Sequence, residues 1–264
     1  MSFFSANHIT AGYGNGHIIE DISFDLAEVS LMGILGANGS GKTTLLKAIC
    51  GILPHEGSCL LENFRLEDLS VRQKAKLCGY IPQRSGISID ISVLDVVLMG
   101  FNPHMGLLEH PTKSMHTAAR QALEQVGLAE KAQMNYLHLS EGQKQLCILA
   151  RTLVAESKLL LLDEPESALD FRYRYRILSI LRNWVQRNKS SAIITLHDPV
   201  LALNYCESLL LLSQGTALGT IHPKTDSIET MEQMLSKIYG NISLQYVHTR
   251  NGISQLIMLN EDTI

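Results

Sequence analysis

The chain has 264 residues, of which 45% are hydrophobic and 18% are charged. This composition is that of a folded globular protein with a sizeable core, and it excludes a disordered or fibrous chain. The formal net charge is -4, and no block of basic residues occurs, so we expect no nucleic-acid partner held by charge. The five cysteines are widely spaced without a CxxC pair, which is typical of free thiols in a reducing compartment.

The sequence carries no signal for crossing a membrane. The first residues lack the basic and apolar regions of a signal peptide. No apolar run reaches the length that spans a bilayer, which is about 18 residues. We therefore expect a cytoplasmic chain that works at a membrane only through a partner.

The N-terminal part predicts strands that lead into a helix. Residues 18–26 alternate apolar and polar side chains, with Ile18, Ile22, Phe24 and Leu26 apolar, which predicts a half-buried antiparallel strand. Residues 31–35 form a continuous apolar run and predict a buried strand. A glycine-rich turn and a helical apolar pattern over 44–49 follow, so this strand enters a helix through a loop.

The middle of the chain, about 92–155, predicts helices and almost no strand. The helical patterns cover 114–126, 129–134 and 141–155. Buried-strand signals return at 159–162, 192–196 and 209–212, with helices predicted at 170–188 and 199–206. The tail, 228–264, holds one helix pattern and two possible strands, which finish the domain. The pattern predicts a parallel sheet interrupted by a helical insertion.

The strongest motif is a glycine-rich loop at 36–43, with the sequence GANGSGKT. It matches G-x-x-x-x-G-K-[ST] and lies between a predicted strand and a helix, where such a loop binds phosphate. Backbone N–H groups turn toward phosphate oxygens, Lys42 supplies positive charge, and the Thr43 hydroxyl can ligate Mg²⁺. The alternative is a glycine-rich loop without a ligand. The residues assigned to the nucleotide are Gly36, Asn38, Gly39, Ser40, Gly41, Lys42, Thr43 and Thr44.

A second motif is the aliphatic run at 159–162, which ends in Asp163 and Glu164. Open parallel sheets bind ligands at the carboxyl ends of their strands, so the run delivers both carboxylates to such an edge. We expect Asp163 to hold Mg²⁺, and Glu164, one residue further toward the solvent, to polarise an attacking water. The alternative is that the two acids merely begin a turn before Pro165.

Two further segments decide the family. LSEGQ at 139–143 closely resembles the LSGGQ signature of ATP-binding cassette (ABC) proteins. Gln83 in YIPQ resembles the Q-loop of that family, SALD at 167–170 its D-loop, and His197 its switch histidine. Tyr13 resembles the aromatic residue that stacks on adenine. On these motifs, in order from 13 to 197, the chain is identified as a member of the ABC family.

The resemblance implies a fold. It implies an α/β P-loop NTPase with a mixed sheet core, an N-terminal antiparallel β subdomain and an inserted helical subdomain. Residues 1–264 would form a single ABC ATPase domain, with a RecA-like core at 1–83 and 156–264 and a helical subdomain at about 84–155.

The resemblance also implies a head-to-tail homodimer, because the phosphate loop and the signature lie on different lobes. Each ATP would lie between the phosphate loop of one copy and the signature of the other. The signature residues that would contact it are Ser140, Gly142 and Gln143.

The family assigns catalytic roles to Glu164, His197 and Gln83, and it places Asp170 among the residues at the nucleotide. Glu164 would act as general base on the lytic water, and His197 would contact the γ-phosphate. Gln83 would sense the metal and the water, and would count among the metal ligands with Thr43 and Asp163. Asp170 would couple the two copies.

One residue departs from the signature. Glu141 stands where the family has the first glycine of a pair. A carboxylate in the first turn of a helix suits the helix dipole but would be repelled by a triphosphate that it faced. We expect its side chain to point away and leave the site active; the alternative is a slow or degenerate site.

Three histidines invite a metal interpretation, which the spacing does not favour. His104, His110 and His116 do not share one helix face, prolines interrupt the segment, and no Cys or carboxylate cluster completes a tetrahedral set there. We interpret them as surface residues.

The kind of cassette follows from what surrounds the motifs. The segment 92–104 resembles the stretch after the Q-loop in importers of iron-siderophore, haem and cobalamin type. The resemblance thus implies an ATPase subunit of a multi-chain importer for such a metal chelate. The alternatives are a molybdate, zinc or manganese importer, a small exporter, or a soluble regulatory cassette.

The implied partners are polytopic permease subunits and, indirectly, a periplasmic or extracellular solute-binding protein. The chain would lie on the cytoplasmic face of the inner or plasma membrane as a peripheral subunit. We expect the permease to dock at about 84–108, where the apolar residues look exposed; the alternative is that they pack the helical lobe. These residues are Ile87, Ile89, Ile91, Val93, Val97, Met99 and Phe101.

Overall fold

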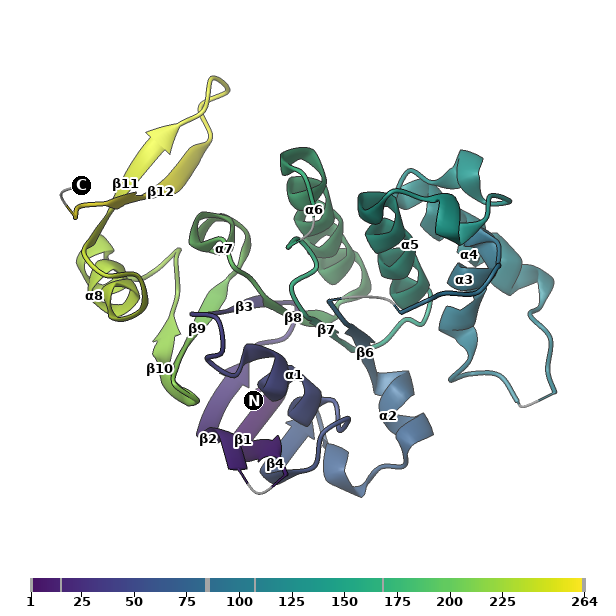
Figure 1. Ribbon diagram of the computed structural model, residues 1–264, viewed down its shortest axis with the longest axis horizontal. Coiled ribbons are helices and arrows are strands. Elements are labelled where there is room, and N and C mark those ends of the chain that lie inside the picture. Colours follow the sequence, from purple (N-terminus) through teal and green to yellow (C-terminus); the bar gives the residue numbers. More distant parts are fainter. Residues whose placement is uncertain (1, 15, 84–85, 107, 168, 263–264) are drawn as a thin grey trace. The chain divides into compact units, whose positions relative to one another are not determined.

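The structure is a computed structural model, and it describes residues 2–14, 16–83, 86–106, 108–167 and 169–262. The chain folds into two compact units. One consists of Met1–Glu67 and Ile193–Ile264, and the other of Asp68–Ala192. The segment 84–155, expected to form a helical subdomain, lies within the second unit. Figure 1 shows the helices and strands of both units.

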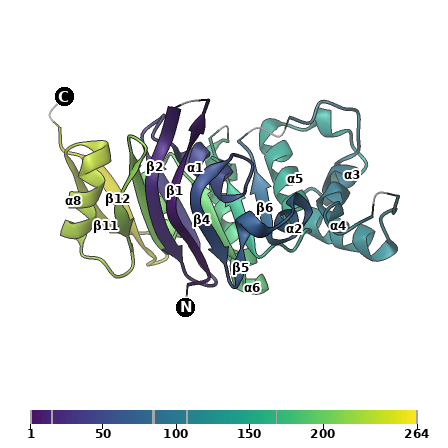
Figure 2. The same ribbon diagram turned by 90° about the horizontal axis from the view of Figure 1, so that it is seen from below.

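The first unit contains an antiparallel sheet, and Figure 2 shows its strands β2, β1 and β4 next to one another. Its middle strand β1 pairs antiparallel with β2 on one side and with β4 on the other. The strands, in spatial order, are β2 (Gly16–Leu26), β1 (Phe4–Tyr13), β4 (His55–Leu61) and β5 (Phe64–Arg65). The antiparallel strand expected at 18–26 is confirmed.

The alternation of side chains along β2 changes face at a bulge. Ile18 was expected to face inward, but it is 39% exposed, whereas Ile19 is fully buried. Asp21 has a φ of 52°, and the pairing of β1 with β2 shifts register between Ile9 and Ala11. Because one extra residue moves the following side chains to the opposite face, the expectation for Ile18 was wrong.

The first unit also contains buried parallel strands of a second sheet. β3 (Leu31–Gly36) is buried throughout and pairs parallel with β9 (Ser208–Ser213). β10 (Thr216–Ile221) pairs antiparallel with β9, which makes the sheet mixed. β8 (Ser191–Thr195) neighbours β3, and the boundary of the two units falls within it. The helices that follow β3 and β8 are α1 (Lys42–Ile49) and α7 (Pro199–Tyr205).

The tail adds one helix and one hairpin to the first unit, as the sequence pattern predicts (Figure 1). These are α8 (Ile228–Tyr239), β11 (Ile242–His248) and β12 (Ser254–Asn260). The amide of Asn204 on α7 both donates to the carbonyl of Leu256 (2.8 Å) and accepts from its N–H (2.9 Å). Glu232 on α8 accepts the N–H of Leu244 at 2.6 Å. Side chains thus hold both edges of the hairpin.

The second unit combines two parallel strands with helices. β6 (Cys78–Ile81) pairs parallel with β7 (Leu159–Leu162), and β7 neighbours β8, so the order is β8-β7-β6 with β6 at the edge. Figures 1 and 2 both show α3, α4 and α5 side by side. The helices are α2 (Val71–Leu77), α3 (Val93–Leu98), α4 (Lys113–Gln125), α5 (Glu141–Leu153) and α6 (Phe171–Asn188).

Two expectations for the helical segment were wrong. The helix expected at 129–134 is only a 3-10 turn, Ala129–Lys131, because it follows the left-handed Gly127 and no side chain caps its start. Val93 and Val97, expected to look exposed, are fully buried on α3. Ile89, in contrast, is 57% exposed. The lobe therefore uses part of this apolar segment for its own core.

The fold class agrees with the sequence-based expectation. The chain is an α/β protein with a mixed sheet, a separate antiparallel sheet near the N-terminus and a helix-rich second unit. Among the described residues, none of the helices combines the length and apolarity needed to span a membrane.

Candidate active site

The glycine-rich loop connects β3 to α1, as expected. Gly39 (φ 79°) and Gly41 (φ 100°) adopt the left-handed backbone conformation that favours glycine. A Cβ on Gly41 would lie 2.4 Å from Cγ2 of Ile19, which belongs to β2. The antiparallel sheet therefore closes one side of the loop, and no larger residue fits at Gly41.

The loop also forms a narrow cradle at its start. A Cβ on Gly36 would lie 2.4 Å from the Oγ of Ser40 and 2.5 Å from the carbonyl oxygen of Leu212. The Oγ of Ser40 is buried and has no hydrogen-bond partner among the described residues. Gly41, the N-cap of α1, offers no side chain to the first N–H groups of that helix. An uncapped helix start beside a buried hydroxyl suits an anionic phosphate.

The side chain of Lys42 closes the loop from inside. Lys42 is 4% exposed, and its ammonium group donates to the carbonyl oxygens of Gly36 (2.9 Å) and Ala37 (3.2 Å). Because a buried ammonium group is costly unless it is hydrogen-bonded, these carbonyls fix its position. Thr43 remains partly exposed, whereas Thr44 is 5% exposed. The Thr43 hydroxyl is thus the more accessible of the two candidate ligands.

His197 follows β8 and is exposed. The N–H of Leu196 donates to the carbonyl of Ile34 on β3 at 3.1 Å, so the histidine leaves the sheet close to the start of the phosphate loop. Asp198 fixes the next turn, because its Oδ1 accepts from the N–H groups of Val200 (2.9 Å) and Leu201 (3.1 Å). The first unit therefore brings the loop and His197 to one edge.

Tyr13 is the last residue of β1 and is 52% exposed. It lines a cavity of about 500 Å³ in the first unit, together with Gly12, His17 and Pro54 among others. An exposed aromatic ring over an open cavity can stack on a planar base. Adenine stacking by Tyr13 stays a prediction.

The second unit holds the other candidate catalytic residues. Because β6 and β7 run parallel and in register, Gln83 and Glu164 leave the sheet at neighbouring strand ends. The Nε2 of Gln83 donates to Oε2 of Glu164 at 2.7 Å and lies 3.4 Å from the Oγ of Ser167. The N–H of Asp163 donates to the carbonyl of Ile81 at 2.9 Å. The structure thus joins Gln83 and Glu164 directly, although they are 81 positions apart in the chain.

Glu164 differs from the sequence-based expectation in its exposure. It was expected to lie toward the solvent, but it is 9% exposed, and Asp163 is 3% exposed. Glu164 has a φ of 46°, a left-handed conformation that is uncommon outside glycine. This backbone turn returns the side chain toward Gln83 instead of letting it extend outward. Glu166 is also buried, at 2% exposed.

The signature motif begins α5. Ser140 is its N-cap: the Oγ accepts the N–H of Gln143, and the Gln143 side chain accepts the N–H of Ser140, which forms a capping box. Glu141 pairs with Lys144 on the same helix at 2.8 Å, and its side chain is 72% exposed. Its carboxylate is thus neutralised by a neighbour one turn away.

Gly142 and Asp170 shape the contact between α5 and the start of α6. A Cβ on Gly142 would lie 3.2 Å from the ring of Tyr173, so α5 and α6 approach closely there. Asp170 is the N-cap of α6, and its Oδ1 accepts the N–H of Tyr173 at 3.1 Å. Ala168, within the expected D-loop, lies outside the described residues.

The comparisons with known proteins decide the family. Residues 19–167 match the family model described as ABC transporter. The chain belongs to the ABC transporter family. It is therefore an ATPase subunit of ABC type, which the phosphate loop and the carboxylates after β7 had indicated.

Individual relatives of this ABC ATPase carry transport names. The hemin import ATP-binding protein of Bordetella pertussis is 35% identical over 244 residues, which is 89% of this chain and 91% of that protein. The manganese transport system ATP-binding protein of Bacillus subtilis is 32% identical over 237 residues, or 89% of this chain and 91% of that protein. A solved structure of a metal-chelate type ABC transporter is 26% identical, with a TM-score of 0.83 over 99% of both chains.

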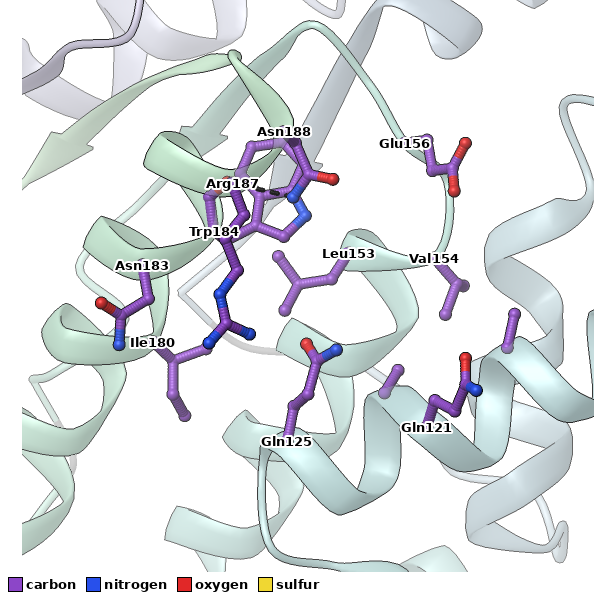
Figure 3. Close-up of a pocket in the computed structure, with 12 residues that line it drawn as sticks. Gln121, Gln125, Leu153, Val154, Glu156, Ile180, Asn183, Trp184, Arg187 and Asn188 are labelled. Atoms are coloured by element: carbon purple, nitrogen blue, oxygen red, sulfur yellow. Dashed lines mark hydrogen bonds between the residues drawn. The ribbon is translucent and has the colours of Figure 1, made fainter.

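The ABC ATPase also has a cavity that no motif indicated. It has a volume of about 390 Å³ in the second unit and is lined by residues of α4, α5 and α6 (Figure 3). Trp184 lines it, together with the polar side chains of Gln121, Gln125 and Arg187. None of its lining residues belongs to the motifs, so it is separate from the candidate catalytic residues.

Sequence reasoning missed one contact of the ABC ATPase, which lies beside the turn after His197. Burial and the negative charge of Asp198 raise the pKa of Tyr239 on α8 to about 12, so the tail helix packs beside the turn after His197. Burial raises the pKa of Cys147 on α5 to about 12, which makes it an inert packing thiol. The contact of Tyr239 leaves no local sequence signal, because Asp198 is far from it in the chain, whereas a free Cys147 was expected from the sequence.

The phosphate loop generates a prediction on two glycines that differ in their surroundings. Gly39→Ala meets no atom within 4 Å and adds only backbone strain, about 1–2 kcal/mol. Gly41→Ala adds the same kind of strain and also collides with Ile19. We expect Gly41→Ala to bind a fluorescent ATP analogue about tenfold or more weakly than Gly39→Ala, since a further 1.4 kcal/mol is tenfold. Equal affinities of the two variants, both shown folded by circular dichroism, would contradict the role of Ile19.

Proposed function

We propose that this ABC ATPase drives an importer for a metal chelate, of the iron-siderophore, haem or cobalamin kind. The observation that carries the proposal is the 35% identity to a hemin import subunit over 89% of the chain. The match to a metal-chelate type transporter over the whole chain supports it. A manganese importer is the second candidate, favoured by the relative from Bacillus subtilis.

The nucleotide of this proposal is ATP with Mg²⁺, and the metal neutralises charge on the phosphates when it is bound. The cradle of Gly36, Gly39 and Gly41 accepts the phosphates, and Lys42 exchanges its loop carbonyls for phosphate oxygens. Thr43 and Asp163 are the oxygen ligands that suit a hard cation. Tyr13 stacks on adenine.

The catalytic step rests on Glu164. Its carboxylate takes the proton of the attacking water, and burial keeps competing solvent from that oxygen. Gln83 holds Oε2 of Glu164 through its amide, so the carboxylate has one fixed orientation. His197, which is exposed just after β8, contacts the γ-phosphate in this proposal.

The complete site needs a second copy in this proposal. Ser140, Gly142 and Gln143 begin α5, a helix of 13 residues whose N-terminus offers N–H groups and a positive dipole end to the γ-phosphate of the other copy. The pairing of Glu141 with Lys144 supports an active signature, because it keeps that carboxylate occupied. Asp170 couples the two copies.

The membrane partners are polytopic permease subunits, with a solute-binding protein on the far side. The chain then lies peripherally on the cytoplasmic face of the membrane. We assign the docking surface to the segment 84–108, of which residues 84, 85 and 107 lie outside the described part. The exposure of Ile89 supports this, and the burial of Val93 and Val97 narrows the surface to residues before α3 and after it.

The assignment of the general base gives a first test. Glu164→Gln keeps the amide contact to Gln83 but removes the proton acceptor, so we expect ATP turnover to fall by about 100-fold to 10,000-fold while ATP binding persists. Light scattering with trapped ATP should then detect the dimer. Lys42→Ala should instead lose ATP binding and the dimer together.

The matched control is Glu130→Gln, an exposed carboxylate in the 3-10 turn that lies outside every motif. It should keep wild-type turnover. If Glu164→Gln did so as well, Glu164 would not be the base. If ATP left the mass of Glu164→Gln unchanged even with the permease present, the head-to-tail dimer would be wrong.

The docking surface gives a second test. Single cysteines at the exposed positions Ser88 and Asn102 should crosslink to the permease in membranes, and their crosslinks should need an intact complex. Cysteines at Lys224 and Asn251, exposed in the first unit, serve as matched controls and should react weakly. Crosslinks from the two control positions alone would move the docking surface away from 84–108 and leave the ATPase assignment intact.

The transported solute gives a third test. The ATPase can be co-purified with its permease, reconstituted in vesicles, and mixed with the solute-binding protein loaded with haem, a ferric siderophore, cobalamin or Mn²⁺. We expect the chelates to stimulate ATP hydrolysis several-fold and Mn²⁺ to leave it at the basal rate. Stimulation by Mn²⁺ alone would replace the proposal with the manganese importer.

A further inference from the structure

Three side chains of different chemistry meet in the first unit, away from the ATPase motifs. His55, Cys59 and Glu67 each offer one ligand atom, and these atoms all lie within 4.8 Å of one another. Among the described residues, they are the one group of at least three histidine, cysteine or acidic side chains close enough to hold a metal ion. The imidazole is 7% exposed, the thiol is fully buried, and the carboxylate is 23% exposed.

The backbone explains why the three meet. His55 and Cys59 lie on β4, an even number of residues apart, so their side chains share one face of the strand. Gly57, between them, has a φ of 94°, and a Cβ there would lie 2.4 Å from the carbonyl oxygen of Asn7 on β1. Glu67 comes from the 3-10 turn Leu66–Asp68, which follows the short β4–β5 hairpin and returns its carboxylate to β4.

The surroundings of His55 contain more acceptors than a neutral imidazole can satisfy. Its Nε2 lies 3.1 Å from Oε1 of Glu67, and its Nδ1 lies 3.4 Å from the carbonyl oxygen of Leu53. A neutral ring carries only one N–H. In the neutral ring, the other nitrogen therefore directs a lone pair toward an oxygen, and a cation between these two atoms would stabilise the pair. If Nδ1 donates to Leu53, the lone pair of Nε2 and the carboxylate of Glu67 converge on one point.

Glu67 is held as a carboxylate. Its Oε1 accepts the N–H of Cys59 at 2.8 Å, and its Oε2 lies 3.3 Å from Nε of Arg65. Partial burial raises the pKa of Glu67, but the backbone hydrogen bonds and His55 together lower it by more. The pKa of this carboxyl group therefore lies below its usual range. A negative oxygen with one hydrogen bond already made still has a lone pair for a metal.

We propose that His55, Cys59 and Glu67 bind one Zn²⁺ ion, with a water as fourth ligand. Nitrogen, thiolate and carboxylate oxygen are the three ligand types that zinc takes in proteins. The thiolate and the carboxylate together neutralise the two charges of the ion. Binding displaces the thiol proton to the solvent.

The three ligand atoms would have to move closer together to bind one zinc ion. Bonds of about 2.0–2.3 Å in a tetrahedron put ligand atoms roughly 3.3–3.8 Å apart. Because the ligand atoms all lie within 4.8 Å of one another, the separations exceed this range by at most about 1 Å, which rotation of the imidazole and the glutamate can close. The ion would lie next to the cavity of Tyr13, which His55 also lines. The proposal does not depend on the transported solute.

The test uses the purified full chain with Co²⁺ as a spectroscopic probe and Zn²⁺ in equilibrium dialysis. A Co²⁺–thiolate bond absorbs in the near ultraviolet, whereas Co²⁺ on oxygen ligands does not. We expect one equivalent of either ion per chain, the thiolate band, and a higher melting temperature. Cys59→Ser should abolish the band, and Cys59→Ser and His55→Ala should each weaken zinc binding at least about tenfold, since even an outer-shell partner is worth 10–100-fold.

Matched controls come from the same chain. Cys206→Ser changes another buried thiol, and His8→Ala removes a histidine that pairs with Asp21 on the same sheet, so both should keep the band and the affinity. Glu67→Gln preserves shape and should weaken binding even if Cys59→Ser fails to fold. No retained zinc at micromolar concentration, or a band that survives in Glu67→Gln with unchanged affinity, would overturn the proposal.

Discussion

The phosphate loop and the candidate catalytic residues of this chain depend on one constraint, which is that buried parallel strands end abruptly in polar sequence. β3 ends at Gly36, where the phosphate loop begins, and β8 ends just before His197. β6 and β7 end just before Gln83 and Asp163. Because each strand is buried along its length, the first residues that can meet a ligand are those after its carboxyl end.

The same constraint leaves the charged groups of Lys42 and Glu164 buried, and hydrogen bonds stabilise each of them locally. The ammonium of Lys42 is held by the carbonyls of its own loop. Glu164 is buried and receives the amide of Gln83, at the expense of a left-handed backbone. In the free protein Lys42 is therefore held by carbonyls that a phosphate would have to replace, and Glu164 is held by the amide of Gln83.

The antiparallel sheet packs against the phosphate loop and also carries His55 and Cys59, which meet Glu67. Ile19 from β2 closes against Gly41, and the bulge at Asp21 is what turns Ile19 inward. On the far strand β4, Gly57 permits the backbone approach that puts His55 and Cys59 on one face near Glu67. Irregular residues in this sheet thus decide which side chains reach the neighbouring sites.

The sequence by itself determined the features that depend on contiguous residues. The phosphate loop, the strand before Asp163 and the signature at the start of α5 are local patterns, and apolar runs and helical spacing were enough to predict the strands and helices beside them. The tertiary structure decided whatever depends on residues far apart in the chain or on an exact backbone turn. The bond from Gln83 to Glu164 spans 81 positions. The burial of Val93 and Val97, the inward turn of Ile19, and the meeting of His55 with Glu67 likewise follow from packing and register. No short-range pattern encodes these contacts, because a change of one residue in register reverses the face that a side chain occupies.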